Sequence, residues 1–167
     1  MAAARSNPDP AEEPCRIQSV KLDNETLVRW SAEVEHERQV AMFDLLEANH
    51  FRLIDGPIGP YDLFLGLKDT TLILEARPVV DAEPVELRLP MRPFRTLIKD
   101  YFLICESYFN AIKTATPSRI EAIDMARRGL HDEGAEEISD ALAARVEMDR
   151  NTARRLFTLI CVLHVRG

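Results

Sequence analysis

The chain has 167 residues, of which 46% are hydrophobic, and a net charge of −7. This length and hydrophobic content suit one core, so we expect residues 15–167 to form a single domain behind a disordered tail at residues 1–14. The charge argues against a protein whose whole surface binds nucleic acid or anionic membrane. Without a secretory signal or about 20 consecutive apolar residues, the sequence predicts a cytoplasmic protein with no membrane partner.

The N-terminal half carries signals for strands and one helix. A strand is predicted at Arg16–Leu22, and a helix at Val34–Ala48, where apolar residues recur at helical spacing. Glycine and proline at residues 56–60 then interrupt regular structure. Three strand-like segments follow, separated by short polar turns, at residues 61–68, 71–77 and 85–89. They predict an antiparallel meander in the middle of the chain.

The sequence after Pro93 predicts only helices. Pro93 suits the first turn of a helix that continues to Ile112. A helical wheel places the apolar side chains of this helix on one wide face, with Leu103 as the one large apolar residue on the polar half. Thr116 and Asp149 are the predicted caps of two later helices. The last helix is apolar on every side at residues 156–163, which is typical of a helix in the middle of a fold.

The segment Ile120–Gly134, IEAIDMARRGLHDEG, admits two interpretations. One unbroken helix would place four polar side chains on one face, namely Glu121, Asp124, Arg128 and His131. His131 would then be a proton carrier or a ligand. Alternatively, Gly129 ends a helix in the left-handed conformation and Asp132 caps another, so that ordinary helix-end charges explain the segment without chemistry. We favour this second interpretation, which leaves His131 in a turn and pairs Asp124 with Arg128.

These elements predict the fold class. Strands come first and helices later, which indicates an α+β domain. We expect an antiparallel β-meander of three to five strands packed on a layer of about five helices, with the C-terminal half all helical.

Six basic residues could converge on a phosphate or carboxylate group, because paired guanidinium groups bind such anions in a fixed fork. They are Arg95, Lys99, Arg127, Arg128, Arg154 and Arg155. In such a site, His131 or Asp100 would transfer a proton. The competing interpretation is ordinary pairing with surface carboxylates, since exposed ion pairs are common and individually weak.

Other chemistry-bearing residues predict no metal, cofactor or nucleophile. Two Glu-x-x-His segments, Glu33–His36 and Glu47–His50, have the spacing of di-iron bundles but lie on different faces of about one helix, so they cannot enclose one metal pair. The cysteines have no metal-ligand spacing and are expected to be free thiols: Cys15, Cys105 and Cys161. The sequence has no glycine-flanked serine, phosphate loop or dinucleotide fingerprint.

A DNA-binding helix-turn-helix could be drawn from Ala135–Arg145, a turn at Val146–Met148 and a second helix from Arg150. Its supporting helix would bring four carboxylates towards the phosphates, namely Glu133, Glu136, Glu137 and Asp140. We therefore do not expect a nucleic-acid partner.

Four long segments resemble a known family. They are VEHERQVAMFDLLE at Val34–Glu47, PFRTLIKDYFLICESYFNAI at Pro93–Ile112, TPSRIEAIDMARRGLHDEG at Thr116–Gly134 and DRNTARRLFTLICVLH at Asp149–His164. They are similar to an uncharacterised alphaproteobacterial protein family (UPF0262), and the resemblance covers nearly the whole chain after residue 14. It implies a bacterial cytoplasmic protein, but no activity and no functional residues.

The expected function is a non-enzymatic interaction or regulatory module that binds a protein partner or a second copy of itself. Missing catalytic motifs and segregated charge favour it: residues 92–128 hold seven basic and four acidic side chains, whereas residues 129–149 hold seven acidic side chains and Arg145 alone. One alternative is an enzyme or sensor for a small anionic metabolite. A second is a nucleic-acid or ribosome-associated protein that uses the basic segment.

Overall fold

The computed structural model describes residues 14–24, 30–80 and 82–165. The tail expected at residues 1–14 lies outside these ranges except for Pro14. The described helices are α1 (Ala32–Glu47), α2 (Arg95–Thr114), α3 (Pro117–Leu142) and α4 (Arg150–Leu163). The described strands are β1 (Ile17–Leu22), β2 (Phe51–Leu53), β3 (Tyr61–Lys68), β4 (Thr71–Pro78), β5 (Val85–Pro90) and β6 (Val146–Met148). The domain is therefore α+β, as predicted.

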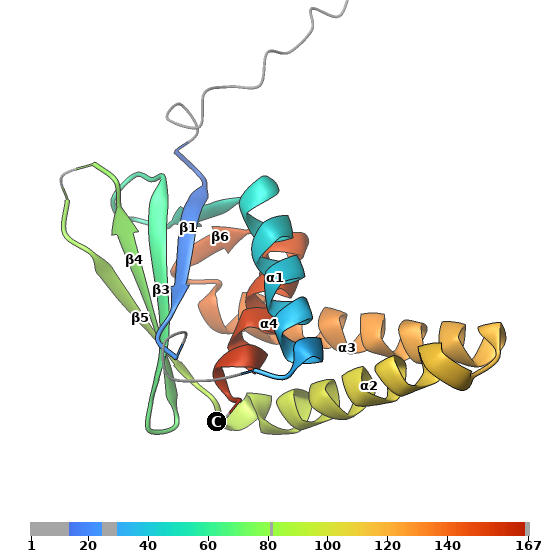
Figure 1. Ribbon diagram of the computed structural model, residues 1–167. Coiled ribbons are helices and arrows are strands. Elements are labelled where there is room, and N and C mark those ends of the chain that lie inside the picture. Colours follow the sequence, from blue (N-terminus) through green and yellow to red (C-terminus); the bar gives the residue numbers. More distant parts are fainter. Residues whose placement is uncertain (1–13, 25–29, 81, 166–167) are drawn as a thin grey trace, which may run out of the picture.

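The main sheet has four strands in the order β1-β3-β4-β5. The predicted meander is confirmed for β3, β4 and β5, which pair antiparallel in sequence order. The prediction of a purely antiparallel sheet is wrong, because β1 pairs parallel to β3, with Val20 opposite Leu63. The connection through α1 carries the chain back between these two strands, so they run in the same direction (Figure 1).

A separate two-stranded ribbon corrects the prediction that the C-terminal half is all helical. β2 and β6 pair antiparallel, with Phe51 opposite Met148 and Leu53 opposite Val146. β6 also occupies the residues assigned to the turn of the possible helix-turn-helix. Three residues are too few for strand periodicity to be recognised from sequence. The pairing is also distant, since Arg52 and Glu147 face each other across 95 residues of chain.

α1 and α4 lie side by side against one face of the main sheet (Figure 1). The prediction for α4 is confirmed, because every residue from Leu156 to Leu163 is buried. The sheet meets the helices through the inward side chains of β3, Tyr61, Leu63 and Leu65, which are also buried. Burial of each large apolar side chain stabilises the folded state by roughly 1.5–3 kcal/mol. The apolar contacts of α4 with its neighbours therefore supply much of the stability of the core.

α2 and α3 form an antiparallel hairpin that extends away from the sheet (Figure 1). The base of α2 is buried through Ile98, Tyr101 and Cys105. The wide buried face predicted for α2 is incomplete towards the tip, because Ile112 is 49% exposed there. The hairpin extends beyond the body of the domain, so the outer apolar residues contact fewer elements.

The predicted helix break at Gly129 is wrong. α3 runs unbroken through residue 129, and none of the described glycines has a positive φ. His131 therefore lies within a helix, and the described residues form four α-helices instead of about five. Gly134, later in α3, lies so close to α4 that a β-carbon there would overlap the ring of Phe157. We attribute the continuous helix to this packing, which offsets the roughly 1 kcal/mol cost of a glycine in a helix.

Substitutions of the two glycines test the continuity of α3. A β-carbon at Gly129 would meet open space, so Gly129→Ala should raise the free energy of unfolding by about 0.5–1 kcal/mol. Gly134→Ala should lower it by roughly 1–3 kcal/mol through overpacking against Phe157. Urea unfolding measures both changes. A loss of stability in Gly129→Ala would show that a left-handed glycine ends the helix at that residue.

Candidate functional site

A pocket lined by arginines lies where α1, α3 and α4 meet, and its volume is about 230 Å³. Four of the six basic residues proposed for anion binding line it, from two helices: Arg127, Arg128, Arg154 and Arg155. His131 lies among them, and α1 contributes His36, Glu37 and Asp44. We name these eight side chains the arginine pocket. They converge because α4 packs against both α1 and α3.

Arg127 is the most firmly held of the four arginines. Its Nη1 lies 3.2 Å from Oε1 of Glu37, and its Nη2 lies 3.2 Å from Oδ1 of Asp124. Its guanidinium carbon stands 4.3 Å from the centre of the Tyr108 ring, where the ring attracts a cation. The Tyr101 hydroxyl donates to the other oxygen of Glu37 at 3.2 Å. Glu37 thus ties α1 to α2 and α3, and its charge is already compensated.

The other three arginines have looser or more exposed contacts. Arg128 forms the predicted pair with Asp124 at 3.0 Å, but its side chain is 70% exposed. The Nη1 atom of Arg154 lies 3.6 Å from Asp132, and the Nη2 atom of Arg155 lies 3.5 Å from Asp44. Both distances exceed those of a good N–H···O hydrogen bond. The Nε atom of Arg154 is in addition buried without a hydrogen-bond partner.

His131 is held neutral beside the arginines. Its Nδ1 lies 2.9 Å from the carbonyl oxygen of Arg127. A carbonyl can only accept, so Nδ1 carries the hydrogen, and Nε2 of the neutral ring is an acceptor. The ring makes edge contacts with Tyr101 and Phe157, at centroid distances of 5.6 and 6.2 Å. Burial lowers the pKa of His131 below its usual value, because the imidazolium form is poorly solvated.

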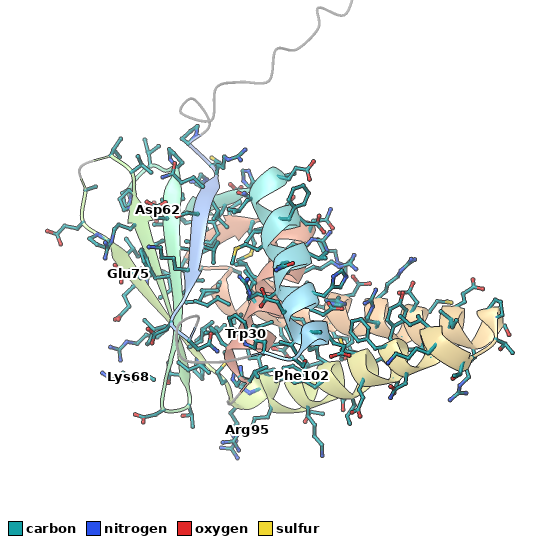
Figure 2. The ribbon with its side chains drawn as sticks, viewed as in Figure 1. Trp30, Asp62, Lys68, Glu75, Arg95 and Phe102 are labelled. Atoms are coloured by element: carbon teal, nitrogen blue, oxygen red, sulfur yellow. The ribbon has the colours of Figure 1, made fainter. Side chains whose placement is uncertain are left out.

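The remaining sequence candidates do not join this pocket. Arg95, Lys99 and Asp100 are exposed in the first turns of α2 and are absent from the pocket lining. Figure 2 shows the Arg95 side chain pointing away from the rest of the domain. These three residues lie on the polar half of the wheel of α2, and no residue of α2 lines the pocket.

Sequence reasoning missed Glu37 and Tyr101 as parts of the site. The signal for Glu37 was present: it falls within the apolar stripe of α1, between Val34 and Ala41 at helical spacing. A carboxylate in such a stripe needs a buried partner. Tyr101 falls on the wide apolar face of the wheel of α2, and its hydroxyl likewise needed a partner. The identity of either partner depended on the packing of three helices.

A second feature is an apolar groove along the hairpin, with a volume of about 290 Å³. Its lining comes from both helices: Asp100, Leu103, Ile104, Ser107, Ala126 and Leu130. We name it the hairpin groove. Leu103, the apolar residue on the polar half of α2, is 53% exposed and lines this groove. Packing in the core does not explain why a leucine lies on the polar half of α2. Its side chain instead lines the hairpin groove on the surface.

Two of the cysteines are buried thiols, and the side chains of the two Glu-x-x-His segments are dispersed. Burial raises the pKa of the Cys105 thiol to about 12 and that of Cys161 above its usual value, so both thiols stay protonated at neutral pH. Glu33 and His36 line different pockets, whereas His50 pairs with Glu147 at 3.2 Å. Within residues 14–24, 30–80 and 82–165, no three His, Cys, Asp or Glu side chains could hold a metal together.

The chain matches one known family over nearly its whole length. The model of the uncharacterised protein family UPF0262 matches residues 14–166. The chain belongs to this family. A UPF0262 protein of Paramagnetospirillum magneticum is 53% identical over 91% of this chain and 97% of its own length. One of Rhodospirillum rubrum is 55% identical over 89% of this chain and 91% of its own. No solved structure matches the chain.

The family assignment covers the hairpin groove and the arginine pocket, because both lie within residues 14–166. A UPF0262 protein of Phenylobacterium zucineum, 51% identical, aligns over 95% of this chain and 99% of its own length. In the described part of the chain, no helix combines the length and the apolar character that crossing a membrane requires.

The half-buried position of His131 predicts a pH dependence of stability. Since its pKa is lowered on folding, the unfolded chain takes up a proton first as the pH falls. The contribution of His131 to the free energy of unfolding is fully present above the ordinary pKa of about 6.5. It is lost as the pH falls from there towards the pKa of His131 in the folded protein. The loss is at most about 1.4 kcal/mol per pH unit, the limit for one proton.

Urea unfolding between pH 7.5 and 5.5 measures this dependence. The free energy of unfolding should fall more steeply with acid in the wild type than in His131→Gln. A control, His36→Gln, removes an exposed histidine from the same pocket and should keep the wild-type slope. Equal slopes in all three proteins would contradict the lowered pKa of the half-buried His131.

Proposed function

We propose that this protein is a non-enzymatic interaction module that pairs with a second copy of itself through the hairpin groove. The observation that carries the proposal is the exposed apolar lining of this groove on a hairpin that extends from the domain. Two packed helices bury only the faces they turn to each other. A further pair of helices would cover the groove, as in a four-helix bundle.

The groove has the composition of a helix-docking surface. Leu103 is 53% exposed, and Met125, the neighbour of Ala126 in the chain, is 64% exposed. On α3, Ala122, Ala126 and Gly129 recur at spacings of four and three, which places small residues on one face. Gly129 has open space around its α-carbon. Small side chains let a second helix approach closely.

A second copy fits the charges at this edge. Lys99 and Asp100 are adjacent and exposed on α2, and Lys99 shares a face with Leu103 one turn later. In a two-fold pair, each residue of one copy can face the other residue of its partner. A rim with both signs of charge therefore complements itself, whereas a partner of one charge sign would meet repulsion at half of the rim.

Self-association is tested by the molar mass of the purified protein in solution. Light scattering coupled to size exclusion should give a dimer at micromolar concentration. Leu103→Glu should weaken the dimer roughly hundredfold or more, because it would bury a carboxylate without a partner. Ala126→Glu should do the same from the opposite wall of the groove. Both positions lie on the surface of the hairpin, so the monomers should stay folded by circular dichroism.

Ile58→Glu is the matched control, because Ile58 is an exposed apolar residue, at 68%, outside the hairpin. This variant should dimerise like the wild type. A wild-type protein that stays monomeric up to 100 µM would contradict the pairing of two copies, and so would a Leu103→Glu variant that remains dimeric.

A further inference from the structure

We propose that the arginine pocket binds the phosphate group of a small organic phosphate. This inference does not depend on the hairpin groove, because no side chain lines both. The pocket presents four guanidinium groups from α3 and α4 around one space of about 230 Å³. Guanidinium groups bind phosphate oxygens in a bidentate fork, and several such groups together neutralise a dianion.

The free donors of α4 carry the argument furthest. Arg154 and Arg155 are only 26% and 34% exposed, yet their closest carboxylates stand at 3.6 and 3.5 Å. Each guanidinium has five N–H donors, and the Nε of Arg154 is buried without a partner. The carboxylate contacts of both side chains are too long for good hydrogen bonds. Phosphate oxygens in the pocket would supply closer acceptors for the terminal N–H donors of the two guanidinium groups.

The carboxylates near the pocket do not prevent the binding of an anion. Glu37 is engaged by the Tyr101 hydroxyl and Arg127, and Asp124 is engaged by Arg127 and Arg128. The remaining two, Asp44 and Asp132, make the loose contacts with Arg155 and Arg154. Asp132 is 43% exposed, so it can turn to water when an anion takes its place beside Arg154.

His131 and His36 suit the neighbourhood of a phosphate ester. The acceptor Nε2 of His131 can take a hydrogen bond from a hydroxyl of the organic part. His36 is exposed at the edge of the pocket, next to Val40, which is 44% exposed. The opening thus combines a polar and an apolar side chain, as the organic part of a metabolite requires.

Thermal unfolding with inorganic phosphate as the probe tests the site. Phosphate should raise the melting temperature of the wild type above that in sodium chloride of equal ionic strength, because a ligand of the folded state stabilises it. Phosphorus NMR or calorimetric titration then gives the affinity. Arg154→Gln and Arg128→Gln should each weaken phosphate binding about tenfold to hundredfold, as expected for the loss of a charged hydrogen bond. Arg128 is mostly exposed, so its variant should fold even if Arg154→Gln does not.

Arg95→Gln and Lys99→Gln are matched controls, because each removes one exposed positive charge outside the pocket. They should bind phosphate like the wild type. Equal melting temperatures in phosphate and chloride would overturn the proposal, as would equal losses in the pocket and control variants. Stabilisation by succinate without stabilisation by phosphate would also overturn it, since the pocket would then select carboxylates.

Discussion

The apolar surface of α4 must be covered on every side, and the arrangement of the domain follows from this requirement. A helix with apolar residues all round is stable only in the interior. The sheet covers one side of α4 through β3, while α1 and α3 pack along other sides. The contact with α3 is close because Gly134 has no side chain where the Phe157 ring lies. Loss of this close approach would separate α3 from the core.

The same requirement places the arginine pocket at the edge of the core. The first two turns of α4 carry Arg154 and Arg155, and the continuous run of buried residues begins at Leu156. When α1 and α3 close around the apolar part, they also partly enclose the two guanidinium groups. Glu37 and Arg127 lie at the same edge, where Tyr101 reaches them from α2. A polar layer thus borders the apolar core: its charges come from α1, α3 and α4, and α2 adds the neutral hydroxyl of Tyr101.

Sequence periodicity predicted those helices and strands well whose pattern does not depend on a distant part of the chain. The strands at residues 61–68 and 85–89 and the caps at Thr116 and Asp149 agree with the structure, since both caps accept the expected backbone hydrogen bonds. The direction of β1 and the strand β6 were not predictable in this way, because each depends on a distant partner. The helix end predicted at Gly129 was wrong, because the local sequence around a glycine is the same whether the helix ends there or continues. Packing elsewhere in the helix decides between the two.

The candidate site shows the same limit. Arg127, Arg128, Arg154 and Arg155 could be recognised as pairs on two helices, but their meeting depends on how α3 and α4 pack. Arg95 and Lys99 carried equal weight in the sequence, and the orientation of α2 places them elsewhere. Glu37 was detectable as a charge within an apolar stripe. Its partners were not, because they belong to helices far along the chain.

The unbroken course of α3 gives the molecule a mechanical connection between its two surface features. At about 1.5 Å per residue, its 26 residues make a rod of about 39 Å. Ala126 on one side of this rod lines the hairpin groove, and the adjacent Arg127 lines the arginine pocket. A single turn of a helix bends little, so Ala126 and Arg127 move together. A rotation of α3 that brings Ala126 closer to a partner at the hairpin groove must therefore also shift Arg127 in the arginine pocket. The apolar part of α4 stays fixed in the core, and the distance between the two arginine pairs would therefore change with the tilt of the hairpin.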